Sequence, residues 1–248
     1  MSFPHTIFGK FGDEKETSTA KRRALGTVLE LPDGRKFKYV KNGSGAITAG
    51  KGVASKQMVA NHDMDLVTAA AAAGASEVTV TLGGTAATAN QYSDGYLYTN
   101  DGTGEGQIYR IKSHPAADAS ATLTLTLDEN DKLVDALDST TLSGLIENPY
   151  NEVVVSPTTV VSRTVGVRTT SLAASEYGYV QTNGLASILM GGAAVSGEPL
   201  RLEGNSGQPG AFIKLDRDGT DENEQEIGVC QGINAVDTDY CLAFLNID

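Results

Sequence analysis

The sequence predicts a mainly β protein, built of β-sandwich or small β-barrel modules that follow an extended N-terminal arm with a β-hairpin. Three observations support this class. Short segments in which apolar and polar residues alternate at period 2 recur along the chain, as in half-buried strands. Gly and Pro turns separate these segments at intervals of about a dozen residues. Strands do not alternate with long helical patterns, which argues against a doubly wound sheet.

Composition limits the class of protein further. The 248 residues are 40% hydrophobic and 20% charged, which indicates a globular chain of one large or two ordinary domains. The N-terminus has no apolar stretch typical of a signal peptide, and no window approaches the roughly 18 apolar residues of a membrane span. We therefore expect a soluble protein made in a cytoplasm. Cys230 and Cys241 lie in strand-like segments and read as small buried hydrophobes, with a cross-strand disulfide left open.

Charge is divided by position along the chain. Residues 1–56 carry eleven Lys and Arg against five Asp and Glu, whereas the remaining residues carry eight against twenty-six. Such asymmetry concerns partners and solubility rather than fold. It suggests a protein that holds a partner with its basic end.

The first 149 residues contain a hairpin, four strands and one helix candidate. Residues 27–40 read as a hairpin around Pro32-Asp33-Gly34, and the Ala-rich residues 59–73 as a short helix or an extended connection. Residues 128–147 are the best helix candidate, closed by Asn148-Pro149. The alternating segments predict strands at residues 77–82, 95–100, 106–113 and 121–127.

After Tyr150 eight further short strands are predicted, the last of them at the C-terminus. The resulting division has three parts: a basic arm and hairpin at 1–56, a β-rich domain with a short helix near its end at 57–149, and a C-terminal β-sandwich or barrel at 150–248.

Two loops resemble functional sites. Ser206 in the string GNSGQP is similar to the nucleophile loop of chymotrypsin-like hydrolases, with His62 or His114 as the base, but neither histidine context matches that family. A tight turn is the favoured interpretation. The acidic loop with Asp216, Asp218 and Asp221 is a weak calcium candidate, because its Gly falls at position four rather than six of the EF-hand pattern. We expect a solvated loop, no catalytic residues, no metal and no cofactor.

The basic segment is the main electrostatic feature. It favours docking onto an acidic protein surface over a merely solvated hairpin, and nucleic acid is disfavoured because the rest of the chain is acidic. Phe3, Phe8 and Phe11 are the expected apolar anchors. The cations expected to dock are Arg22, Arg23, Arg35, Lys36 and Lys38.

The second half of the chain resembles the head decoration, or cement, proteins of tailed bacteriophages. The resemblance is carried by EYGYVQTNG (176–184), GGAAVSGEPL (191–200), GQPGAF (207–212) and the ending from Ile227. Two further stretches, 100–117 and 146–155, look like longer members of this type. The resemblance covers roughly residues 95–248, contains no catalytic motif, and allows no functional residue to be carried over individually.

This resemblance implies a compact β module and a structural, non-enzymatic role. Such a protein binds the outer face of a phage capsid and stabilises it by bridging capsomers. The implied partners are the major capsid protein and neighbouring copies, with a trimer expected, and neither nucleic acid nor membrane. The implied location is the virion. The alternatives are a serine hydrolase using Ser206 and a tail or fibre adhesion component.

Overall fold

The chain folds into two compact units. The computed structural model describes residues 5–157, 162–202, 208–216, 225–232 and 236–247. Unit 1 comprises residues 1–56 and 149–248, and unit 2 comprises the continuous segment 57–148. The limits of unit 2 lie within one residue of those predicted. However, the predicted arm and the predicted C-terminal module form a single unit, because their strands belong to one sheet.

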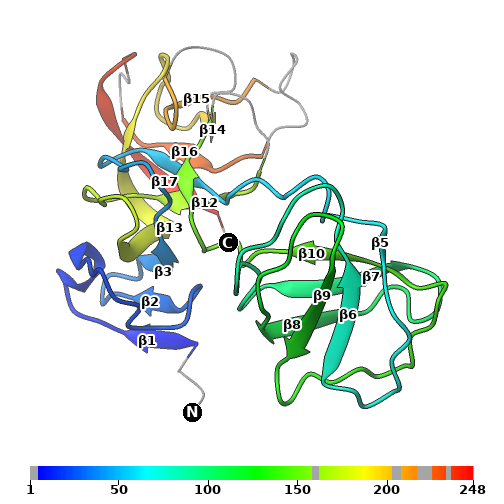
Figure 1. Cartoon of the computed structure of the whole chain (residues 1–248). Coiled ribbons are helices and arrows are strands. Elements are labelled where there is room, and N and C mark those ends of the chain that lie inside the picture. Colours follow the sequence, from blue (N-terminus) through cyan, green and yellow to red (C-terminus); the bar gives the residue numbers. More distant parts are fainter. Residues whose placement is uncertain (1–4, 158–161, 203–207, 217–224, 233–235, 248) are drawn as a thin grey trace. The chain divides into compact units, whose positions relative to one another are not determined.

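The prediction of a mainly β fold is confirmed (Figure 1). Within the described ranges the one helix is the 3-10 turn η1 (Asp13–Lys15), and no helix is long and apolar enough to cross a membrane. The strands of unit 1 are β1 (Thr6–Phe8), β2 (Val28–Glu30), β3 (Lys36–Lys41), β4 (Gly52–Ala54), β11 (Val154–Val155), β12 (Thr164–Val167), β13 (Tyr177–Leu189), β14 (Pro199–Leu202), β15 (Phe212–Lys214), β16 (Gly228–Cys230) and β17 (Tyr240–Asn246). The strands of unit 2 are β5 (Leu66–Val67), β6 (Glu77–Thr81), β7 (Tyr96–Asp101), β8 (Ile108–Ser113), β9 (Thr122–Leu127) and β10 (Leu142–Ile146).

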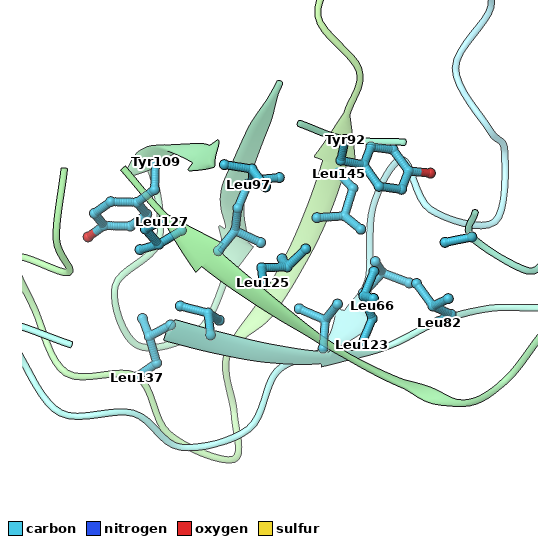
Figure 2. Packing of buried hydrophobic residues seen from close by; sticks show 14 of the residues in the cluster. Leu66, Leu82, Tyr92, Leu97, Tyr109, Leu123, Leu125, Leu127, Leu137 and Leu145 are labelled. Carbon is cyan, nitrogen blue, oxygen red and sulfur yellow. The ribbon is translucent and has the colours of Figure 1, made fainter. Parts of the chain in front are cut away.

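Unit 2 is a small six-stranded barrel. Its strands follow the order β5-β10-β7-β8-β9-β6, and a bridge between Thr68 and Val80 joins the two ends of the sheet. Strand β9 has the period-2 pattern of a barrel wall, because its Leu residues face inward and its Thr residues face outward. Figure 2 shows Leu97, Leu125 and Leu145 gathered between these strands. All three are buried, so unit 2 has a hydrophobic core of its own.

The prediction of a helix over residues 128–147 is wrong. The segment forms turns and then strand β10. Asp side chains explain the turns, because they bond nearby backbone N–H groups that a helix would need: Asn130 N–H donates to Asp128, and Thr140 N–H donates to Asp138. The Ala-rich stretch is the extended alternative, since Ala71 forms a bridge with Leu137.

The hairpin predicted over residues 27–40 is confirmed as β2 paired with β3. It does not belong to a free arm. Two-stranded hairpins are marginal alone, and this one buries Leu29 and Phe37 in a cluster that also includes Tyr179 of β13. Strand β1 extends the same sheet by parallel pairing with β2 (Figure 1). Removal of residues 1–26 would therefore disrupt unit 1 itself, because the predicted N-terminal arm is part of its sheet.

Strand β13 is the central strand of unit 1. Two of the eight short strands predicted after Tyr150, residues 177–184 and 186–191, are here largely one strand of 13 residues. The pairing with β3 shifts between Gln181 and Asn183, and Gly184 has φ +89°, a conformation that Gly adopts without strain. The Gln181 amide donates to the carbonyls of Asn183 and Leu185, which satisfies acceptors at this bulge.

The C-terminal strands surround a third core. The order β13-β17-β16-β14-β15 returns to its start, because Met190, directly after β13, bridges Phe212 of β15. Cys230 and Cys241 are free, with their sulfur atoms 4.0 Å apart. Burial and the neighbouring Cys230 raise the pKa of Cys241 to about 12, so the thiol stays protonated. The pair therefore packs as two small hydrophobic side chains in this structure.

Candidate docking site

Three tyrosines from β3 and β13 form the floor of a pocket in unit 1. The antiparallel register places Tyr39 opposite Tyr179. The ring of Tyr39 stacks on Tyr177 with centroids 5.9 Å apart and meets Tyr179 edge to face at 5.2 Å. Such aromatic pairs are worth about 0.5–1.5 kcal/mol beyond their burial. The floor is therefore fixed by pairing between strands and by ring packing.

The segment after η1 forms the rim of this pocket. Ser18 and Tyr177 exchange backbone hydrogen bonds of 3.0 and 2.8 Å, and Arg22 N–H donates to the Tyr39 hydroxyl at 3.1 Å. These bonds hold the segment across the tyrosines. The pocket has a cavity volume of about 50 Å³. Its lining residues are Glu16, Thr17, Ser18, Arg22, Arg23, Tyr39, Tyr177 and Tyr179.

The rim carries the positive charges of Arg22 and Arg23, and neither arginine forms a close ion pair within the described residues. Arg22 lies 3.9 Å from Glu16, and both side chains are more than half exposed, so this pair contributes little. Arg23 is half-buried and forms no ion pair within the described part of the chain. The two arginines therefore remain able to receive an anion.

The hydroxyls of Tyr39 and Tyr179 are held neutral. Burial raises the pKa of Tyr39, although the Arg22 N–H and the nearby arginine charges oppose it. Burial also raises the pKa of Tyr179, and the opposing effect of Arg23 is smaller. The Tyr179 hydroxyl is buried, with Arg23 placed to donate to its oxygen, and among the described residues its proton has no acceptor. It is a neutral donor that lacks an acceptor.

Besides Arg22 and Arg23, a further cation, Arg168, lies beneath strand β13. Arg168 is fully buried, and its guanidinium donates to the carbonyl of Tyr179 and, at 3.4 Å, to that of Ser171. Burial lowers the pKa of Arg168 to about 10, partly opposed by Glu176, so the group is charged at neutral pH. A Cβ at Gly178 would lie 3.0 Å from the Leu172 side chain and 3.3 Å from this guanidinium, so there is little room for a side chain at that position. Arg168 thus adds positive charge behind the pocket.

Two of the three hairpin cations predicted to dock, Arg35 and Lys38, have internal partners. Arg35 pairs with Asp33 at 2.7 Å and lies over Phe37, with 5.7 Å from its guanidinium carbon to the ring centroid. Lys38 lies 5.9 Å from the ring centroid of Tyr150. Lys36 is half-buried on β3. Among the predicted docking cations, Arg22 and Arg23 are the two that line the pocket.

The predicted aromatic anchors lie on the surface of unit 1. Phe8 ends β1 with 83% of its side-chain surface exposed, and Phe11 in the following turn is 61% exposed. Phe3 lies outside the described residues. Phe8 and Phe11 are therefore exposed apolar side chains at the end of the edge strand β1 and in the turn after it, within the basic N-terminal segment.

The two histidines weighed as catalytic bases are structural in unit 2. His62 bonds the Tyr92 hydroxyl through Nδ1 at 2.5 Å and the Thr85 carbonyl through Nε2 at 2.8 Å. His114 Nε2 accepts from Tyr92 N–H at 2.9 Å, and its Nδ1 lies 2.7 Å from the Pro115 carbonyl. Both ring nitrogens of each residue are thereby engaged. Ser206 lies outside the described residues.

The acidic loop weighed as a calcium site lies largely outside the described residues. Asp216 is exposed, and Asp218 and Asp221 lie outside the described residues. Within the described ranges no group of three or more His, Cys, Asp or Glu side chains is arranged to hold a metal ion.

Sequence reasoning missed two features of unit 1. The first is the tyrosine pocket, whose signal was the alternate placement of tyrosine in KFKYV and EYGYV. The second is an exposed apolar row on β17, formed by Tyr240, Leu242 and Phe244, with Leu185 paired to Phe244 across from β13. The segment YCLAFLN is apolar at almost every position, and this indicated a strand with both faces apolar.

No protein-family model, curated protein or solved structure matches this chain.

Proposed function

We propose that this chain is a structural, non-enzymatic protein that docks on the outer face of a bacteriophage capsid and stabilises the shell by bridging capsomers. The observation that carries this proposal is the edge of unit 1, where two exposed phenylalanines precede a pocket rimmed by Arg22 and Arg23. Exposed aromatic and arginine side chains are enriched where proteins bind other proteins. The bacteriophage assignment itself comes from the resemblance of residues 95–248.

Charge supports a protein partner and opposes nucleic acid. Unit 2 carries three Lys and Arg against thirteen Asp and Glu, whereas residues 1–56 carry an excess of six positive charges. A polyanion such as DNA is repelled by an acidic unit of this kind. An acidic patch on a folded protein can instead meet the basic edge alone.

The docking edge is an ordered part of unit 1 and not the extended arm predicted from the sequence. Residues 5–23 are tied to the sheet by β1 and by the bridge between Ser18 and Tyr177. A surface that is already ordered loses less conformational entropy on binding than a disordered one. On a capsid the same weak contact is repeated many times, so avidity between linked copies would hold the protein in place.

The proposal includes contact between neighbouring copies, with a trimer as the expected assembly. The exposed row of Tyr240, Leu242 and Phe244 on β17 is the apolar surface that supports it. Light scattering of the purified chain measures its mass directly. A monomer at all concentrations, together with single isolated copies on decorated shells, would reject this part of the proposal.

The docking experiment is co-sedimentation of the full chain with shells of the cognate major capsid protein. The double variant Phe8→Ser and Phe11→Ser removes both exposed anchors without touching a buried side chain. We expect at least about tenfold weaker binding, because buried aromatic anchors carry about 2 kcal/mol or more at interfaces.

The matched control is Val134→Ser, which removes a 73% exposed apolar side chain from unit 2. It should bind as the unmodified chain does. Equal binding by the control and by the double variant would refute the assignment of the docking edge. Electron cryo-microscopy of decorated shells then tests location, since density on a tail or fibre would favour the adhesion alternative.

A further inference from the structure

We propose that the tyrosine pocket of unit 1 binds the side-chain carboxylate of an Asp or Glu on the partner, held by the Tyr179 hydroxyl together with Arg22 and Arg23. This inference rests on the proposed function, because it assumes that the partner is a protein surface. It names the chemical group that the docking edge recognises.

The unsatisfied hydroxyl of Tyr179 is the first observation behind it. Only 3% of the residue is exposed, and within the described ranges its hydroxyl proton has no acceptor, although Arg23 is placed to donate to its oxygen. A buried donor without an acceptor is costly, so an acceptor that enters the pocket gains the bond and removes that cost. A carboxylate oxygen is the strongest acceptor that a protein partner can supply.

The arginine rim is the second observation. Arg22 and Arg23 line the same pocket as Tyr179, and the contact of Arg22 with Glu16 is long, at 3.9 Å. A guanidinium can donate two parallel hydrogen bonds to one carboxylate. At 3.9 Å, Arg22 and Glu16 are too far apart to form them. Glu16 therefore occupies the rim as a weak internal competitor and leaves the deeper donors available.

The size of the pocket limits the ligand. A cavity of about 50 Å³ accommodates a few water molecules or one small charged group. A side-chain carboxylate stands on a methylene stem, so it can enter while its own backbone stays outside. A free C-terminal carboxylate brings its peptide group along, which this volume does not admit. The side chain of Asp or Glu is thus the favoured source.

The test reads the pocket directly and does not require the capsid. Acetate is titrated into the full chain at neutral pH and constant ionic strength, with chloride as the reference anion, and the tyrosine and arginine resonances are followed by NMR. For a ligand of four heavy atoms the expected dissociation constant is on the order of millimolar or weaker. Shifts confined to the resonances of the pocket support the inference.

Three variants test the assignment of donors. Tyr179→Phe removes only the unpaired hydroxyl, and Arg23→Gln removes one cation from the rim; each should weaken acetate binding about tenfold, as expected for hydrogen bonds to a charged group. Glu16→Gln removes the competitor and should strengthen binding. The control Tyr96→Phe removes a hydroxyl on β7 of unit 2, away from the lining of the pocket, and should leave acetate binding unchanged.

Two further probes distinguish the sources of the anion. The peptide acetyl-Gly-Glu-Gly-amide should bind, whereas acetyl-Gly-Gly with a free carboxyl end should bind more weakly. Tighter binding of the second peptide, or of sulfate, would overturn the assignment to a side-chain carboxylate. Absence of acetate shifts in the pocket, or unchanged affinity in both Tyr179→Phe and Arg23→Gln, would overturn the site itself.

The two proposals fail separately. If the chain does not bind shells but acetate binds the pocket, the capsid role is rejected and the carboxylate site stands. If the chain binds shells, and Tyr179→Phe and Arg23→Gln bind them equally well, the pocket plays no part in docking.

Discussion

His114 has both ring nitrogens committed to the backbone of unit 2. Its Nε2 accepts a hydrogen bond from Tyr92 N–H, and Nδ1 must therefore carry the proton that is donated to the Pro115 carbonyl. This arrangement requires the neutral imidazole, because a proton on Nε2 would face the Tyr92 N–H. Burial lowers the pKa of His114, and the bond to Pro115 opposes this only in part.

The first prediction is that unit 2 loses stability as the pH falls below about 6.5. The unfolded chain binds a proton on His114 near its ordinary pKa of 6.5, whereas the folded chain binds it only at lower pH. The free energy of unfolding is therefore highest above that pH. It falls with decreasing pH until the folded pKa is reached, at no more than about 1.4 kcal/mol per pH unit for this one proton.

Urea unfolding at a series of pH values, followed by a signal from unit 2, measures this slope. The variant His114→Gln lacks the titrating group and should flatten the slope between pH values above and below 6.5. His5→Gln changes an exposed histidine in unit 1 and serves as the control. An identical slope in His114→Gln and in the unmodified chain would show that His114 is not the group responsible.

At the scale of elements, strand β10 shows how closely the chain packs around a glycine. A Cβ added at Gly144 would lie 2.2 Å from the carbonyl oxygen of Asp63, which is backbone and cannot rotate away. The strand pairs with β7 on one side and with β5 on the other, so neither edge can shift freely.

The second prediction is that Gly144→Ala destabilises unit 2 by about 2 kcal/mol or more, as expected when an overpacked site must displace backbone. Gly84→Ala is the matched control in the same unit, since the nearest atom to its added Cβ is the Asn61 side-chain amide at 3.8 Å. Thermal unfolding of both variants measures the difference. Equal melting temperatures would mean that Asp63 moves aside at little cost.

The elements differ in how far the sequence could predict them. Strands such as β6 and β9 were predictable because one face is buried and the residues alternate strictly. The segment 128–147, which ends in β10, was not predictable. Leu133 and Leu137, which precede the strand, have helical spacing, and only the tertiary structure shows that both fill the core of unit 2. The Asn183-Gly184 pair reads as a turn in isolation, but the pairing of β13 with β3 and β17 extends the strand through it.

The candidate site was predictable only in its basic residues and its phenylalanines. The basic residues of the N-terminal segment were identified from composition, and so were the exposed phenylalanines. The pocket required a contact between Ser18 and Tyr177, which are distant in sequence and are joined by no local pattern. Composition also could not reveal that Arg35 pairs with Asp33, since that depends on how the hairpin turn orients both side chains.

At the scale of the whole molecule, unit 2 is a continuous segment inserted into unit 1. Its hydrophobic core contains residues from Leu66 to Leu145 and none from unit 1. Unit 1 depends in contrast on both of its segments, because β3 from the first pairs with β13 from the second. Stability is therefore organised by unit and not by the order of the chain.

The third prediction is that a fragment of residues 57–148 folds alone. It retains all six strands and the complete core of unit 2, and the barrel leaves no strand without a neighbour. Circular dichroism and cooperative thermal unfolding of the fragment measure this. The fragment of residues 149–248 lacks β1 to β4, leaves one side of β13 unpaired and should aggregate. A fragment 57–148 without a cooperative transition would contradict the division into units.

The insertion has a consequence for what unit 1 can tolerate. The chain leaves unit 1 just after β4 and re-enters it just before β11, and these two strands pair with each other, Ala54 opposite Val154. Lys56 and Glu152 lie beside this doorway and are joined by a 3.0 Å ion pair. A short designed turn, or an unrelated domain whose own termini are close together, could replace unit 2 between β4 and β11 with unit 1 left intact. Unit 1 thus provides an insertion point for an unrelated protein domain.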